Sequence, residues 1–412
     1  MRVLMVHSFH HPRGGDTTYT RDLSTLLRSA GHEVIPLAMR HPDNEPSPWE
    51  ARFPSWVEMR GAEGGLARAR AALGLVWSPE AAQAASAMAQ ELRPDVAHVQ
   101  HLHRHLTPSV LSALRRQGVP IVWTVHDYEL ICPSGLLFTQ GRPCERCMGH
   151  RYHHAVLNRC KWDGALPSLA VAVEKWVHHL AGVWDLVDRF LCPSLHLAQA
   201  LVRFGVPAAR VQHLPNFLDS DEVPTGTLPG DGWLYAGRLA EEKGVHVALE
   251  AARRLPGHEL TICGSGPMEA ALRAQAADLP WVRFLGQQPR QEVARLLRGV
   301  RAVVVPSLWP ENYPYAVLEA QRASRAVVAS DIGGIPEQID HQRDGMLVPP
   351  GDSVALARAV GGLLDDPSRA QALGQAGRER VVRDRQPQDH LRAVLQVYAQ
   401  VRSAGDQGRT PA

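Results

Sequence analysis

Short apolar runs alternate with helical segments along the chain, and this alternation restricts the fold more than any other feature of the sequence. Residues 2–7 form an apolar run, the pair Gly14-Gly15 follows, and a helical pattern then leads to a second apolar run at residues 33–38. Buried parallel strands read as continuous apolar runs, and each needs a crossover, usually helical, to reach the next strand. The pattern predicts an α/β protein with doubly wound parallel sheets.

The same strand and helix rhythm begins again in the second half of the chain. A chain of 412 residues exceeds what one hydrophobic core usually supports. A stretch rich in proline, glycine and acids separates the two sets of elements and is expected to be a linker. We therefore expect an N-terminal Rossmann-like domain at 1–218, a linker at 219–232 and a C-terminal Rossmann-like domain at 233–387. The last helix, 388–412, is expected to cross back to the first domain.

Composition excludes several classes of protein. The formal net charge is +2 and 21% of the residues are charged, which favours neither nucleic-acid binding nor an acidic tail. No uncharged stretch is long enough to span a membrane, and the first apolar run is too short for a signal peptide. We expect a cytoplasmic protein. Peripheral contact with the inner face of a membrane stays compatible with the sequence.

The stretch from Pro306 to Glu319 carries the clearest chemical signal. It follows an apolar run at 302–305 and opens a helix near Pro314, whose missing N–H costs nothing at a first helical position. Such a helix end has unpaired N–H groups and a partial positive charge, and at the end of a strand it suits a phosphate. Glu311 and Glu319 can then accept hydrogen bonds from a hydroxyl-rich ligand. Alternatively, Glu311 complements the helix dipole and Glu319 is a surface residue.

Two basic residues lie in the turn after the apolar run at 233–236. Arg238 and Lys243 can neutralise a diphosphate, the arginine through its planar fork and the lysine as a point charge. A solvated charged loop is the alternative interpretation. The turn containing Gly264 follows the next apolar run and would let a ligand approach the backbone closely.

The first half of the chain has weaker signals. Gly14 and Gly15 permit close approach of a ligand, but they do not form a dinucleotide-binding fingerprint, and an ordinary tight turn is equally compatible. His126-Asp127 follows a predicted strand at 120–125, at the edge where α/β sheets place their chemistry. His126 can donate to a sugar, or it can be satisfied by local backbone. Histidines crowd residues 98–105, where pocket lining is a commoner role than metal binding.

The segment 128–166 is a long loop with four of the six cysteines. Four thiolates around one ion form a closed tetrahedral zinc site, which would stabilise a loop with little core of its own. A redox pair and unligated thiols remain as alternatives, and catalytic zinc is disfavoured because four protein ligands leave no open position. Residues 167–187 then predict a long amphipathic helix. The candidate zinc ligands are Cys132, Cys144, Cys147 and Cys160.

Several of these motifs, in this order, resemble the retaining GT-B glycosyltransferases of family 4. The first half resembles them more loosely, through Gly14-Gly15 and His126-Asp127. The resemblance implies two Rossmann-like domains facing a cleft, with a nucleotide-sugar donor held mainly by the second. The motifs of the second half lie at residues 237–239, 242–244, 264–267, 284–286, 306–307 and in the pair Glu311 and Glu319.

The resemblance also implies roles for individual residues. The donor diphosphate would contact Arg238 and Lys243, and Glu319 would hold the ribose hydroxyls. Glu311 would hold the transferred sugar together with the following backbone. Further donor contacts are implied for Gly14, Gly15, His126, Gly264, Asn312, Tyr313 and Tyr315.

Transfer would retain the anomeric configuration by a same-face route, with no divalent metal or other cofactor in the reaction. The acceptor would be a glycan, a lipid-linked sugar or a small molecule. One departure concerns residues 312–314, Asn-Tyr-Pro, where the family usually has Gly-Phe-Gly or similar, so the donor sugar stays open. A nucleotide-sugar epimerase, a phosphorylase with pyridoxal phosphate and a non-catalytic nucleotide-sugar-binding protein remain as alternatives.

Overall fold

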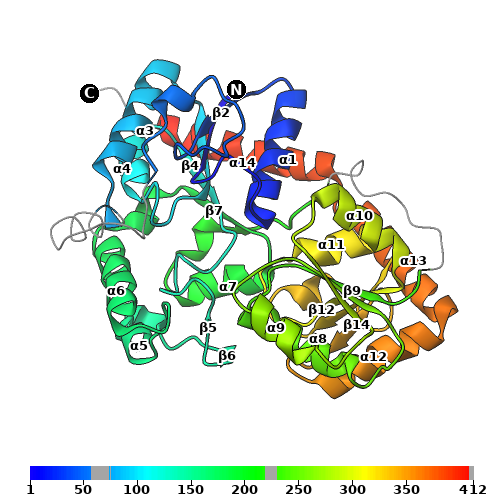
Figure 1. Cartoon of the computed structure of the whole chain (residues 1–412). Helices are drawn as coiled ribbons and strands as arrows, with labels where there is room; N and C mark the ends of the chain where they lie inside the picture. Colours follow the sequence, from blue (N-terminus) through cyan, green and yellow to red (C-terminus); the bar gives the residue numbers. More distant parts are fainter. Residues whose placement is uncertain (57–73, 75, 219–229, 408–412) are drawn as a thin grey trace. The chain divides into compact units, whose positions relative to one another are not determined.

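The computed structural model describes residues 1–56, 74, 76–218 and 230–407. Most of the predicted linker therefore lies outside the described residues. The chain forms two compact units (Figure 1). The first contains Met1–Leu136, Glu145–Pro215 and Gln388–Ala412, and the second contains Leu137–Cys144 and Asn216–Pro387. A short piece of the cysteine-bearing loop thus belongs to the second unit, although the sequence interpretation assigned the whole loop to the first.

The first unit contains a six-stranded parallel sheet in the order β2-β1-β3-β4-β7-β8. Its strands are β1 (Arg2–His7), β2 (Glu33–Leu37), β3 (Val96–His101), β4 (Ile121–Thr124), β7 (Arg189–Cys192) and β8 (Val211–His213). Its helices are α1 (Gly15–Ser29), α3 (Pro79–Leu92), α4 (Ser109–Arg116), α5 (His153–Leu157), α6 (Ala165–Leu180), α7 (Leu195–Arg203) and α14 (Pro387–Gln407). Short 3₁₀ turns lie at Glu50–Arg52, Met148–His150, Val183–Leu186 and Ala208–Arg210.

The second unit contains another six-stranded parallel sheet, in the order β11-β10-β9-β12-β13-β14. Its strands are β9 (Trp233–Ala236), β10 (Leu260–Cys263), β11 (Val282–Gly286), β12 (Ala302–Val305), β13 (Ala326–Ser330) and β14 (Met346–Val348), and a hairpin is formed by β5 (Phe138–Thr139) and β6 (Arg142–Pro143). Its helices are α8 (Val245–Ala252), α9 (Glu269–Gln275), α10 (Arg290–Gly299), α11 (Tyr315–Arg322), α12 (Ser353–Asp365) and α13 (Pro367–Asp384), with 3₁₀ turns at Glu241–Lys243 and Ile335–Glu337. The predicted α/β class with two doubly wound sheets is confirmed.

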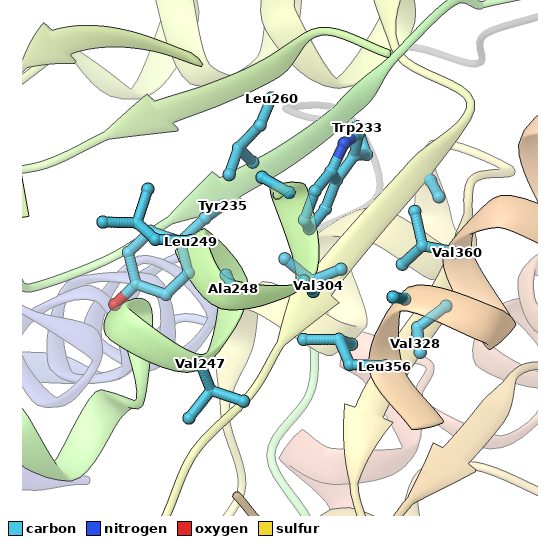
Figure 2. Packing of buried hydrophobic residues seen from close by; sticks show 14 of the residues in the cluster. Trp233, Tyr235, Val247, Ala248, Leu249, Leu260, Val304, Val328, Leu356 and Val360 are labelled. Atoms are coloured by element: carbon cyan, nitrogen blue, oxygen red, sulfur yellow. The ribbon is translucent and has the colours of Figure 1, made fainter. Parts of the chain in front are cut away.

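Helices cover both faces of the second sheet, which explains why most positions of its strands are apolar. Trp233 and Val304 point to the core beneath α8 and α12, as Figure 2 shows. Leu234 and Val303 point to the opposite face and pack with Val317 of α11. Successive side chains of a strand point to opposite faces of the sheet, so one apolar run contributes to the hydrophobic cores on both faces.

The strand order places a topological switch point in each sheet. In the second unit the chain runs from β9 through β10 to β11 and then crosses to pair β12 with β9. In the first unit it runs from β1 to β2 and then crosses to β3. Ligands of open α/β sheets bind outside the carboxyl ends of the strands at such points. A ligand site is therefore expected in the loops after β9 and β12 in the second unit and after β1 and β3 in the first.

The last helix, α14, packs in the first unit through buried polar contacts. The Tyr398 hydroxyl lies 2.7 Å from His98 Nδ1 on β3, and His390 Nε2 lies 2.9 Å from the Tyr19 hydroxyl on α1. His98 also contacts Thr124 Oγ1 at 2.7 Å. Burial lowers the pKa of both histidines to about 3, so both are neutral in the folded protein near neutral pH.

Acid should therefore destabilise the first unit. Between pH 6.5 and about 3 the unfolded chain binds protons at His98 and His390 that the folded chain does not. Their contribution to stability is complete above pH 6.5 and is lost as the pH falls, by about 2 kcal/mol per histidine at about pH 5. We expect His98→Gln to reduce the pH dependence of the free energy of unfolding by about that amount. Denaturant titrations across this pH range would contradict the expectation if wild type and variant showed equal slopes.

Candidate active site

Backbones approach each other closely where β9, β10 and β12 end in the second unit. A Cβ added to Gly264, which has φ +140°, would lie 1.9 Å from the carbonyl oxygen of Gly237. One added to Gly244, with φ +67°, would lie 1.9 Å from the carbonyl oxygen of Pro306. Both positions therefore require glycine. These contacts hold the loop after β9 against the loops after β10 and β12.

A buried carboxylate joins two of these loops. Glu311, whose side chain is 6% exposed, lies in the loop after β12, and Lys243 Nζ donates to its Oε1 at 2.8 Å. The hydroxyl of Ser307 donates to the same oxygen at 2.6 Å. Lys243 also lies 4.8 Å from the ring centre of Trp309. An ammonium group is thus fixed at the switch point by an ion pair and a cation–π contact.

Arg238 lies in the same turn but is far more exposed. Its Nη2 lies 2.5 Å from Oε1 of Glu242, with 60% of the arginine side chain exposed. Solvent screens this ion pair, so its guanidinium can exchange the carboxylate for another anion at little cost. The backbone of Glu242 is fixed, because its carbonyl accepts from the N–H of Leu308 at 2.8 Å. The two predicted cations of this turn therefore differ, since Lys243 is held in place and Arg238 is available.

Helix α11 begins at Tyr315, one residue after the predicted start, and Pro314 occupies its N-cap. Asn312 and Tyr313 are both buried, and the Tyr313 hydroxyl accepts from Arg385 Nε at 2.7 Å. Glu319, on the second turn of α11, has Arg290 Nε 3.9 Å from its Oε1. Tyr313 therefore supports the loop from within, whereas Glu319 stays about one fifth exposed.

The first unit gathers polar groups at the ends of β1, β3 and β4. Gly14 precedes α1 and Gly15 is its first residue. His126 Nε2 lies 2.8 Å from Oε1 of Gln100, and the ring of His126 meets the edge of Tyr19 at 5.0 Å between centres. Burial lowers the pKa of His126 to about 3, so it acts here as a neutral hydrogen-bonding group.

A hollow of the first unit lies beside this edge. It is bounded by the end of β1 and the loop after it, by α1 and by β2. Hydroxyl and cationic side chains share its wall with apolar ones, which suits a polyhydroxylated ligand. The polar lining includes His10, Thr17, Thr20, Arg21, Ser24 and Arg28.

A buried ion-pair network follows His126, and the sequence interpretation did not foresee it. In the described part of the chain, one group of His, Cys, Asp or Glu side chains could hold a metal ion, with its ligand atoms within 4.8 Å of one another. It consists of His101, Asp127 and Glu129. Burial tends to raise the pKa of Glu129, but Arg104, 2.5 Å from its Oε1, acts together with His103, His101 and Lys175 to lower it below its usual range. Burial and the charge of Glu129 raise the pKa of Asp127 well above its usual range. Arg104 thus already neutralises the carboxylate that a metal ion would need.

The four loop cysteines are not assembled as a metal site in the described residues, since the group above contains none of them. Cys132 and Cys147 are buried, and Cys144 and Cys160 are partly buried. Cys144 belongs to the second unit and the other three to the first. The zinc site stays a prediction from the cysteine spacing, and no reaction step is derived through it.

Comparisons with known proteins agree with this architecture. Residues 13–222 match the family model "Glycosyltransferase Family 4", and residues 232–380 match "Glycosyl transferases group 1". A glycogen synthase of Mycobacterium tuberculosis is 30% identical over 97% of this chain and 94% of its own length. A phosphatidyl-myo-inositol mannosyltransferase of Mycolicibacterium smegmatis is 30% identical over 93% of this chain and 90% of its own length.

Solved structures share the fold. Sucrose-phosphate synthase from Thermosynechococcus elongatus has a TM-score of 0.72 and 22% identity, covering 98% of this chain and 99% of its own. HepE of Anabaena, in complex with UDP and glucose, has a TM-score of 0.66 and 16% identity, covering 97% and 99%. The two doubly wound units and the matches to both family models define a glycosyltransferase of the GT-B fold. The chain belongs to glycosyltransferase family 4.

Proposed function

We propose that the protein transfers a sugar from a nucleoside diphosphate donor to a hydroxyl-bearing acceptor, with retention of configuration. The observation that carries the proposal is the Lys243–Glu311 pair, fixed at the switch point of the second unit before α11. A cation fixed in this way can stabilise the negative charge that builds on a departing diphosphate. The bound UDP and glucose of HepE support a donor of this class.

The chain's residues take distinct parts in this reaction. The bond between the sugar C1 and the diphosphate breaks, an acceptor oxygen bonds to C1 on the same face, and the acceptor proton passes to a phosphate oxygen. Lys243 and Arg238 stabilise the diphosphate, Glu311 orients the sugar, and Glu319 accepts from the ribose. No divalent metal takes part in the transfer, so activity should not depend on added Mg²⁺ or Mn²⁺. The roles implied for Gly15 and His126 stay predictions of the family resemblance.

Nucleotide binding should depend on Glu319. In a thermal-shift panel of UDP, GDP, ADP and dTDP, we expect one nucleotide to raise the melting temperature of the wild type by mass action. Glu319→Gln should lose most of that shift, because the amide cannot accept two ribose hydroxyls as a carboxylate does. Glu379→Gln, on the exposed face of α13, is the matched control and should keep the shift. Equal shifts in the wild type and both variants would remove Glu319 from the site.

Turnover separates the proposal from the alternatives. A retaining transferase releases the nucleoside diphosphate and forms a product with the anomeric configuration of the donor, which NMR reads directly. A binding protein would show the thermal shift without turnover. A phosphorylase would show the absorbance of pyridoxal phosphate. An epimerase would convert the donor sugar without an acceptor.

The proposal also concerns the acceptor and a structural zinc ion. We propose that the hollow beside α1 takes a glycan, a lipid-linked sugar or a small polyol, because hydroxyl and cationic groups line it. The cysteine spacing predicts one structural zinc per chain, and metal analysis of untagged protein decides this. No helix of the described residues is long and apolar enough to cross a membrane.

A further inference from the structure

Helix α6 has its charged residues inside and most of its large apolar residues outside. Glu174 and Lys175 are its only acidic or basic residues apart from two histidines, and both are 3% exposed. By contrast, Leu166 is 79% exposed and Leu180 is 83% exposed. A surface helix normally buries its apolar stripe and exposes its charges. The pattern of α6 is the reverse.

The buried charges are satisfied within the first unit. Lys175 Nζ lies 3.0 Å from Oε1 of Glu174, and Arg104 Nε lies 3.7 Å from Oε2 of the same carboxylate. His178 Nε2 lies 2.8 Å from the carbonyl oxygen of Val76. These contacts set the orientation of α6. If the helix rotated about its axis, its ion pairs would become exposed and its outer leucine and valine side chains would face the buried charges. The outward apolar stripe is thus a fixed property of the fold.

The stripe is concentrated in one part of the molecule. Six large exposed apolar side chains occupy residues 162–180. Helix α5 lies beside α6 (Figure 1) and contains one more, Leu157. Contiguous exposed apolar area of this kind marks an interaction surface. We call it the α5–α6 surface, made of Leu157, Trp162, Leu166, Leu169, Val173, Val177 and Leu180.

Basic residues lie close in sequence to the first residues of the α5–α6 surface. Arg151 and Arg159 are exposed, and Lys161 Nζ lies 5.6 Å from the ring centre of Trp162. Asp163 is the one acidic residue among residues 151–163. Tryptophan and basic side chains suit the level of lipid head groups, with leucine and valine below them. Two copies that paired in parallel through this surface would bring these like charges together.

We propose that the α5–α6 surface docks on an anionic lipid bilayer, with α6 lying in the plane of the interface. A helix of 16 residues is about 24 Å long, and the exposed apolar residues of α6 lie on one side, so it lies on a bilayer and does not span it. The inference does not rest on the proposed function, because none of the proposed donor-site residues belongs to this surface. It adds that the enzyme works beside acceptors held at a membrane.

The test is co-sedimentation of the full chain with vesicles of pure phosphatidylcholine and of an equimolar mixture with phosphatidylglycerol. We expect binding to the mixed vesicles, weaker binding to the neutral ones, and a loss of about tenfold or more in the double variant Leu166→Glu/Leu180→Glu. Both positions are exposed, so the variant should fold. Val354→Glu is the matched control, since Val354 is 47% exposed on α12 of the second unit. Arg159→Glu should remove the preference for anionic lipid.

Three outcomes would overturn the proposal: no binding of the wild type to either vesicle, equal binding of the double variant, or equal loss in the Val354→Glu control. A dimer in light scattering that the double variant abolishes would assign the surface to a second copy instead. Transfer from the donor to a soluble acceptor, measured without vesicles, should be unchanged in the double variant. Failure of that transfer in the wild type would count against the proposed function alone.

Discussion

Replacing Lys243 by alanine should lower kcat/KM for sugar transfer by about 10²- to 10³-fold, the usual loss when one fixed group that stabilises transition-state charge is removed. Lys243 Nζ is held 2.8 Å from Oε1 of Glu311 and 4.8 Å from the ring centre of Trp309, so its ammonium group is already in place when the donor binds. A preorganised ammonium needs no reorientation as charge builds on the diphosphate. The measurement is steady-state transfer with the nucleotide found in the thermal-shift panel.

The controls separate catalysis from folding. Glu311 is buried, so the alanine variant also leaves a carboxylate without its cation, and part of the loss can come from reduced stability. The double variant Lys243→Ala/Glu311→Gln removes that charge and should regain stability without regaining activity. Arg283→Ala breaks an exposed ion pair with Glu259 on the same unit and should keep full activity. Full activity of Lys243→Ala would exclude the proposed role of Lys243.

Gly264→Ala should destabilise the second unit by about 3 kcal/mol or more and abolish nucleotide binding. Its Cβ would lie 1.9 Å from the carbonyl oxygen of Gly237, and φ +140° is a conformation that side chains rarely adopt. The atoms that the new Cβ meets belong to the backbone of Gly237, so they cannot rotate away as a side chain would. The loops after β9 and β10 must then separate, and the loop after β9 carries Arg238 and Lys243. Denaturant unfolding and the thermal-shift panel measure the two effects.

Gly299→Ala provides the matched control for this substitution. Gly299 ends α10 in the same unit, and a Cβ there would meet nothing within 4 Å. The free energy of unfolding of this variant should differ from that of the wild type by less than about 1 kcal/mol, since alanine loses less chain entropy on folding than glycine does. If the two alanine variants unfolded at the same denaturant concentration, close backbone approach at Gly264 would not be the constraint that we infer.

Much of the fold follows from local sequence patterns. The apolar run at 2–7 is strand β1 over the same residues, and the run at 302–305 is β12. These strands are buried on both faces, so their apolar character is continuous and easily recognised. The helix expected at 167–187 is less accurate, because α6 ends at Leu180 and Gly182, with φ +60°, starts a separate 3₁₀ turn. Helix ends depend on such backbone conformations more than on periodicity.

The sequence by itself determined the α/β class and the placement of Arg238, Lys243 and Glu311 in loops at strand ends, because strand and turn signals act over a few residues. Only the tertiary structure decided that Lys243 and Glu311, 68 positions apart, form an ion pair, and that Arg104 neutralises Glu129. It also decided which face of α6 is outside. A helical period says that two faces differ, but the partners that bury one of them are distant in sequence.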